Sequence, residues 1–253
     1  MARWFAAIMA ALGALFLATG AVASGPFANR AAVVGAGDFH AAHTNTPPET
    51  FDNARRDVAA ELIRKGFAAS NVLQFSVRPD RYPDVKPGKS DVQPIYEGLD
   101  HLAKQAKSGC LIYFTSHGAP QGVVLDGQLM PPGLMDQMIS AACGERPTVV
   151  IISACFSGVF VPALETTNRM ILTAARPDRS SFGCSESDKY PYFDACMLQE
   201  LPQAHDFAAL GPEVQNCVAE RETETGASPP SEPQLYIGPA LRPVLPLMAF
   251  APG

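Results

Sequence analysis

The chain has 253 residues, of which 47% are hydrophobic, and its formal net charge is -6. This length and apolar content suit one large or two small globular domains with a substantial buried core. The acidic balance and the lack of a Lys/Arg cluster argue against nucleic acid or an anionic membrane surface as a partner, because phosphate binding needs a concentrated basic face.

Residues 1–23 differ in composition from the rest of the chain. Arg3 supplies a positive charge, residues 4–18 are apolar and rich in Ala and Leu, and Ala21-Val22-Ala23 is a small-x-small motif. This pattern predicts a signal peptide cleaved after Ala23, and therefore a periplasmic or secreted protein with no stable membrane span. An uncleaved anchor is the alternative, but the apolar run is short for a bilayer span.

The remainder reads as an alternation of strands and helices. Short apolar or β-branched runs predict strands at residues 30–37, 71–77, 111–114, 149–152, 169–175 and 234–238, with a short strand and turn at 122–127. Apolar residues at helical spacing predict helices over residues 50–65, 95–106, 132–142, 193–201 and 214–224. The β-α-β order favours parallel strands with right-handed crossovers. We expect one domain over residues 24–238 and a Pro-rich, extended tail over 239–253.

Export would permit disulfides among the six cysteines. If Cys155 must stay reduced, five cysteines remain, so at least one further thiol is free. Cys110 is the best candidate for a plain buried thiol, and Cys184 with Cys196 is the first pairing that we expect. The sequence has no CxxC motif and no His-rich tract at metal spacing, so we expect no metal and no cofactor.

Two of the predicted strands end in reactive side chains. Val149-Val150-Ile151-Ile152 reads as a strand buried on both faces, and Cys155 follows it. His117 and Gly118 follow the strand at 111–114 in the same way. Because the carboxyl ends of parallel strands meet at one edge, where ligands bind in open α/β sheets, we expect these residues to lie together.

A cysteine beside a histidine suggests acyl transfer through a thiolate. Cys155 would attack a carbonyl carbon, His117 would move the proton, and the N–H groups of Gly118 and Cys155 would bind the oxyanion. The other interpretation is structural, because a cysteine after an apolar strand is most often inert and a lone histidine beside glycine is most often a turn residue.

The motifs Phe114-Thr-Ser-His-Gly118 and Ile152-Ser-Ala-Cys-Phe-Ser-Gly158 resemble the two catalytic motifs of the legumain-like cysteine peptidases, the C13 family in the caspase-like clan. Residues 173–177 and 180–184 resemble the segment that lines the specificity pocket in that family. The likeness covers roughly residues 30–200.

The resemblance implies a caspase-like three-layer α/β sandwich, with a mostly parallel sheet flanked by helices. It also implies that Cys155 is the nucleophile, that His117 is its partner and that Gly118 lies in the oxyanion hole. Ser180 and Ser181 would line the S1 pocket. Asp194 would read the P1 side chain of a peptide or protein substrate.

The sequence departs from the family pattern in three places. Ser153 stands where legumains have an acidic residue, which puts a preference for asparagine at P1 in doubt. The expected basic pocket residue has no clean match, although Arg55 and Arg56 are close; a solvated helix face is the other interpretation of these two. The segment after the last predicted strand is too short and too Pro-rich to fold as the C-terminal prodomain of the family.

We therefore expect an exported cysteine endopeptidase that works through a Cys-His dyad and a thioacyl-enzyme. Two alternatives stay open. One is a transamidase or ligase that uses the same dyad, and the other is a catalytically silent relative that binds peptides. The sequence does not indicate the oligomeric state or the P1 residue.

Overall fold

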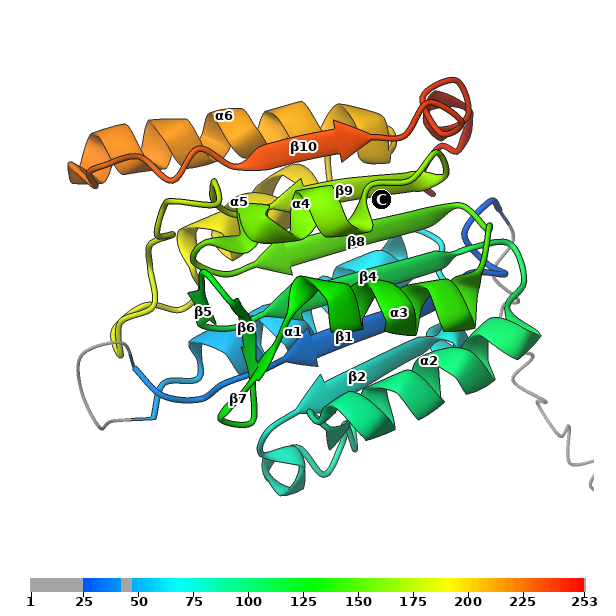
Figure 1. The fold of residues 1–253 in the computed structure, drawn as a ribbon, viewed down its shortest axis with the longest axis horizontal. Helices are drawn as coiled ribbons and strands as arrows, with labels where there is room; N and C mark the ends of the chain where they lie inside the picture. Colours follow the sequence, from blue (N-terminus) through cyan, green and yellow to red (C-terminus); the bar gives the residue numbers. More distant parts are fainter. Residues whose placement is uncertain (1–24, 42–46, 253) are drawn as a thin grey trace, which may run out of the picture.

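A seven-stranded sheet runs through the molecule, with helices on both of its faces (Figure 1). The computed structural model describes residues 25–41 and 47–252, so the predicted signal peptide lies outside the described residues. The strand order is β10-β9-β8-β4-β1-β2-β3, and β10 is the strand that pairs antiparallel. The bounds are β1 Ala31–Ala36, β2 Val72–Ser76, β3 Gly88–Lys89, β4 Cys110–Thr115, β8 Thr148–Ser153, β9 Arg169–Thr173 and β10 Gln234–Ile237.

Helices cover the two faces in separate groups, which makes a three-layer α/β sandwich. The groups are α1 Thr50–Arg64, α5 Tyr192–Glu200 and α6 Phe207–Thr225 on one face, and α2 Val92–Gln105, α3 Pro132–Cys143 and α4 Val161–Leu164 on the other (Figure 1). Short 3₁₀ turns lie at Ala69–Asn71, Pro79–Arg81, Ser157–Phe160 and Leu245–Leu247. The predicted fold class is thus confirmed.

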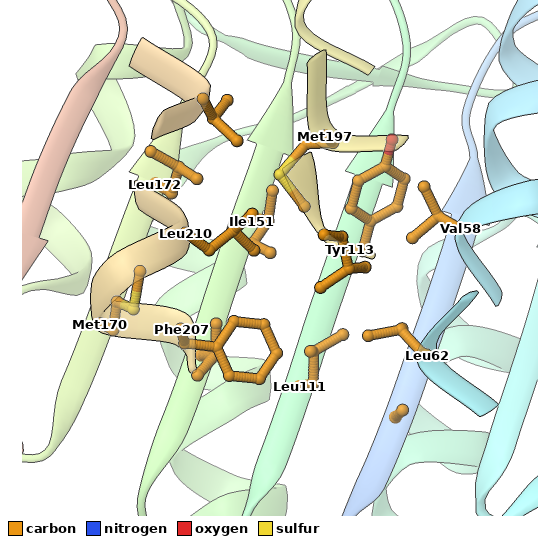
Figure 2. Close-up of a cluster of buried hydrophobic side chains, with 14 of the residues drawn as sticks. Val58, Leu62, Leu111, Tyr113, Ile151, Met170, Leu172, Met197, Phe207 and Leu210 are labelled. Carbon is orange, nitrogen blue, oxygen red and sulfur yellow. The ribbon is translucent and has the colours of Figure 1, made fainter. Parts of the chain in front are cut away.

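Alternate residues of the central strands enter two different cores. Leu111 and Tyr113 of β4 pack with α1, α5 and α6, whereas Ile112 and Phe114 pack with α2, α3 and α4. Figure 2 shows the first core, in which Phe207 lies over the sheet beside Leu111. Because both faces of β4 and β8 are buried, these strands need the unbroken apolar runs that the sequence carries.

Strands β4 and β8 lie side by side and end at the same level. Their parallel register pairs Phe114 with Ile152 and Thr115 with Ser153. The residues that follow the two strands therefore emerge next to one another at the carboxyl edge. A small antiparallel sheet of β5 Gly118–Ala119, β6 Gly122–Leu125 and β7 Gln128–Met130 follows β4 at this edge (Figure 1).

Helix α6 begins earlier than the predicted residue 214. Asp206 caps it by accepting hydrogen bonds from the N–H groups of Ala208 and Ala209, and the helix continues to Thr225. Gly211 and Pro212 weaken the helical signal in this stretch. Pro212 is the sixth residue of the helix and cannot donate an intrahelical hydrogen bond, but the cap and the apolar contacts of Phe207 and Leu210 hold the first turns.

The disulfides correct our expectation for the cysteines. Cys110 bonds Cys143, which links β4 to α3, and Cys196 bonds Cys217, which links α5 to α6. Cys110 is therefore not a free thiol, and the expected Cys184–Cys196 pairing is wrong. The partners lie 33 and 21 residues apart, so helix packing decides the pairing rather than sequence spacing.

Residues 239–252 do not form an extended tail. Leu241, Leu245 and Phe250 are buried in the core beneath α6, where the ring of Phe250 packs edge-on against Phe207 at 4.8 Å. The N–H of Phe250 also donates to the carbonyl of His205. Apolar side chains set between prolines are enough to bury this segment. Within residues 25–41 and 47–252, every helix is too short or too polar to span a bilayer.

Candidate active site

Cys155 and His117 line the same pocket at the carboxyl edge of the sheet. Each follows its strand by two residues, and the paired strand ends bring them together. The cavity has a volume of about 360 Å³. Its lining consists of these two residues, the loop segment from Ser180 to Ser185, and Asp188. The two residues that the sequence singled out therefore share one site with the predicted pocket segment.

A tight turn presents the Cys155 thiol to the pocket. Phe156 has a left-handed φ of 59°, which is uncommon for a bulky residue, and its N–H donates to the carbonyl of Arg179 at 2.7 Å. The Ser181 N–H donates to Cys155 Sγ at 3.3 Å, and the thiol lies 3.5 Å from the Ser181 carbonyl oxygen. The main chain of Ser181 therefore holds the sulfur of Cys155 in place at the pocket.

The ring of His117 is oriented by two contacts. Its Nε2 lies 2.8 Å from the carbonyl oxygen of His40, and the edge of Phe51 meets the ring at 5.0 Å. Because a carbonyl can only accept, Nε2 must carry a hydrogen, which leaves Nδ1 as the basic nitrogen of the neutral ring. The His40 carbonyl thus fixes the tautomer of His117.

Gly118 lies against the backbone of Cys155. A Cβ added at Gly118 would stand 2.1 Å from the Cys155 carbonyl oxygen and 3.0 Å from Cβ of Ala154. Only glycine permits this approach of two main chains. The predicted oxyanion-hole residue is therefore placed beside the predicted nucleophile.

The loop after β9 supplies most of the lining of the cavity. Ser180 and Ser181 both line the cavity, as the resemblance implied. Gly183 has a φ of +84°, and a Cβ there would stand 2.7 Å from the main-chain nitrogen of Tyr192. This glycine holds the loop against the start of α5.

A family model described as the Peptidase C13 family matches residues 63–216, which include both pocket residues. The chain belongs to the peptidase C13 family. This is a family of cysteine peptidases, in agreement with the resemblance of the motifs. A search of curated proteins found no match.

A solved structure of caspase-1 from Spodoptera frugiperda has a similar fold, with a TM-score of 0.58 and 13% sequence identity. The match covers 83% of this chain and 87% of the caspase chain. At this identity the likeness establishes the fold of the C13 chain and nothing of its substrates.

Asp194 of the C13 chain is not among the residues that line the cavity. Its side chain is fully buried in the first turn of α5, and it accepts hydrogen bonds from the hydroxyls of Tyr113 and Thr115. Burial raises the pKa of Asp194 to about 6, although hydrogen bonds from Thr115, Tyr113 and Ser153 oppose the shift. In this structure the carboxylate therefore binds the end of β4.

Arg55 and Arg56 lie outside the lining of the pocket. Arg55 is fully buried and pairs with Asp52 at 2.9 Å and with Gln74 at 2.5 Å, so the solvated-face interpretation is wrong for it. Arg56 lies on the exposed side of α1 and pairs with Asp57. Neither guanidinium supplies the basic pocket residue of legumains.

Three residues of the site have no clear signal in the sequence. The His40 carbonyl acts through the main chain, so the side-chain pattern cannot reveal it. Asp188 lies in a loop with no periodicity, and Cys184 is free although the sequence suggests a disulfide for it. Burial raises the pKa of the Cys184 thiol well above its usual range. Among residues 25–41 and 47–252, no group of three or more metal-ligating side chains is placed to hold an ion.

Proposed function

We propose that this chain is an exported cysteine endopeptidase in which Cys155 is the nucleophile and His117 is its general base and acid. The observation that carries the proposal is the shared pocket. It contains a free thiol that receives the N–H of Ser181 and a histidine whose tautomer is fixed by the His40 carbonyl.

In the acylation step, Cys155 Sγ attacks the carbonyl carbon of the scissile peptide bond and its proton passes to Nδ1 of His117. The carbonyl π electrons move to oxygen, which gives a tetrahedral oxyanion. When the C–N bond breaks, His117 returns the proton to the departing amine, and a thioester remains on Cys155.

In the deacylation step, water attacks the thioester carbon while His117 takes one of its protons. The C–S bond then breaks, the carboxyl product leaves, and His117 returns the proton to the sulfur of Cys155. If an amine attacks in place of water, the same dyad acts as a transamidase, so the residues alone do not separate the two outcomes.

The main-chain N–H groups of Gly118 and Cys155 would bind the oxyanion in both steps. The close approach of Gly118 to the Cys155 main chain supports this assignment, because the two N–H groups must converge on one oxygen. One such donor typically contributes about 10²–10³ in rate.

Export to the periplasm or beyond is part of the proposal. Its support is the composition of residues 1–23 together with the two disulfides, because disulfides persist in oxidising compartments.

The test is covalent labelling with acyloxymethyl-ketone peptide probes that differ at P1 (Arg, Lys, Asn, Asp and a small residue). We expect an adduct on Cys155 that is lost in Cys155→Ala and in His117→Ala. Cys184→Ala is the matched control, since it removes the second free thiol of the described chain, and it should still be labelled.

A folded protein that no probe labels would overturn the peptidase proposal in favour of a silent peptide-binding relative. Product masses measured with a competing amine then distinguish hydrolysis from transamidation.

A further inference from the structure

The pocket beside Cys155 carries one fixed charge, the carboxylate of Asp188. The rest of its lining is His117, Cys155 and six neutral residues: Ser180, Ser181, Phe182, Gly183, Cys184 and Ser185. No lysine or arginine is part of this lining in the described chain. A substrate side chain that enters the pocket therefore meets an anion that no cation in the lining neutralises.

Hydrogen bonds to one oxygen orient the Asp188 carboxylate, and its other oxygen can accept a hydrogen bond from a ligand. Its Oδ2 takes hydrogen bonds from the N–H of Ser185 at 2.8 Å and from the Ser185 hydroxyl at 2.6 Å. The Asp188 carbonyl accepts from the Thr50 hydroxyl at 2.8 Å, which fixes the loop to α1. Within the described residues, Oδ1 makes no hydrogen bond, and this side chain forms no ion pair.

Neighbouring cations are engaged elsewhere. The ammonium of Lys189 lies over the ring of Tyr190, 4.8 Å from its centroid, and Arg56 pairs with Asp57. The charge of Asp188 is thus available to a ligand.

Cys184, which also lines the pocket, lies in the same negative field. Burial raises the pKa of the Cys184 thiol, and the charges of Cys155, Asp194 and Asp188 raise it further. Cys184 consequently stays neutral and adds no competing charge. A cationic group gains in this field, whereas a carboxylate is repelled.

We propose that the pocket selects a cationic P1 side chain, arginine or lysine, with Oδ1 of Asp188 accepting from its guanidinium or ammonium group. The inference rests on the proposed peptidase function and names the substrate class of that site. A volume of about 360 Å³ accommodates either side chain. A hydrogen bond between charged partners is worth about 10- to 100-fold in affinity.

The test compares fluorogenic peptides that differ only at P1, with arginine, citrulline, lysine, asparagine and aspartate. Citrulline keeps the shape of arginine but lacks its charge. We expect kcat/KM to be about 10- to 100-fold higher for arginine than for citrulline, and lowest for aspartate. In Asp188→Asn the arginine-to-citrulline ratio should fall to within about threefold of unity.

Glu186→Gln is the matched control, because Glu186 is an exposed carboxylate on the same loop that does not line the cavity, and its ratio should stay at the wild-type value. If Asp188→Asn fails to fold, Ser185→Ala serves instead, because it removes a hydrogen bond that orients the carboxylate. We expect this variant to lower the ratio by about 3- to 10-fold.

A wild-type enzyme that cleaves citrulline or asparagine substrates as well as arginine substrates would overturn this inference while leaving the peptidase in place. An unchanged ratio in Asp188→Asn would do the same. A folded protein whose Cys155 no probe labels would overturn the peptidase and this inference together.

Discussion

The Thr115 hydroxyl donates a 2.5 Å hydrogen bond to Oδ2 of Asp194, a carboxylate with no exposed surface. Thr115 is the last residue of β4 and stands two residues before His117. Ser153, two residues before Cys155, also helps to lower the pKa of this carboxylate, against the larger effect of burial. One buried group on α5 thus holds both strand ends that lead to the site.

Asp194 should make the stability of the protein fall as pH rises. Its pKa is raised from 3.8 to about 6, so the folded state binds the proton more tightly than the unfolded state. The contribution of Asp194 to the free energy of unfolding is therefore largest below about pH 4 and declines between about pH 4 and 6. By about pH 7 the protein has lost on the order of 3 kcal/mol of stability from this group. Urea unfolding from pH 4 to 7.5 measures this slope.

Asp194→Asn should remove this component of the slope, because the amide does not titrate. Asp178→Asn, which changes an exposed aspartate, should keep it. Equal slopes in wild type and Asp194→Asn would show that the carboxylate does not titrate in this range.

Gly118→Ala should abolish most of the activity with little loss of fold. The added Cβ would stand 2.1 Å from the Cys155 carbonyl oxygen, so the turn that carries the nucleophile must shift. A displacement of about 1 Å near reacting groups costs about 10²-fold in rate. We expect kcat/KM to fall at least about 100-fold, with circular dichroism unchanged.

Gly133→Ala is the control for the Gly118 variant. Gly133 lies in α3, and a Cβ there meets no atom within 4 Å. Alanine should be neutral or slightly stabilising at this helical position. If both glycine variants kept full activity, the oxyanion-hole assignment of Gly118 would be wrong.

The sheet and most helices were predictable because their signals are local and periodic. The apolar run of β8 predicts a strand, and the helical spacing of α1 predicts a helix. The observed bounds of both differ from the predicted bounds by a few residues at most. The site was predictable to the same extent, since Cys155 and His117 follow such strands and the register of β4 with β8 brings them together.

The features that sequence reasoning missed depend on contacts between distant segments. The burial of Phe250 needs the rings of Phe27 and Phe207, which lie more than 40 residues away along the chain. The family resemblance singled out Asp194, but its hydrogen bond to the end of β4 depends on how α5 packs over that strand. Asp188 becomes a candidate binding residue because the folded loop places it in the lining of the pocket.

The two free thiols should differ strongly in reactivity. Cys155 faces the pocket with an N–H group directed at its sulfur, whereas burial raises the pKa of Cys184. Iodoacetamide at pH 7.5 should therefore alkylate Cys155 rapidly and Cys184 slowly, because the thiolate is the reactive form. Peptide mass spectrometry after timed quenching measures both rates, and unfolding in urea should equalise them. Faster labelling of Cys184 would contradict this assignment.

Each disulfide should contribute several kcal/mol to the free energy of unfolding. Loops of 33 and 21 residues correspond to about 3–4 kcal/mol of denatured-state entropy each. We expect each double variant to lose about 3–4 kcal/mol of the free energy of unfolding, measured in urea. The double variants are Cys110→Ala/Cys143→Ala and Cys196→Ala/Cys217→Ala. Cys184→Ala is the control and should lose less, since it closes no loop. If the two pairs cost no more than this control, the assigned connectivity would be wrong.

Phe51 should position the ring of His117. Its own ring is 1% exposed and meets the imidazole edge-on at 5.0 Å, a contact that restricts how the histidine can tilt. Phe51→Leu keeps much of the buried volume but loses this edge, so we expect kcat to fall about 10-fold while KM changes little.

Phe67→Leu is the matched control for Phe51→Leu. Phe67 is equally buried, but it stacks on Phe27 in the core beneath α6. Both variants should lose about 1–3 kcal/mol of stability, as core truncations do. The loss of kcat, measured well below both melting temperatures, should appear in Phe51→Leu alone. Equal kcat values in the two variants would mean that Phe51 only fills space and that the His40 carbonyl suffices to hold the histidine.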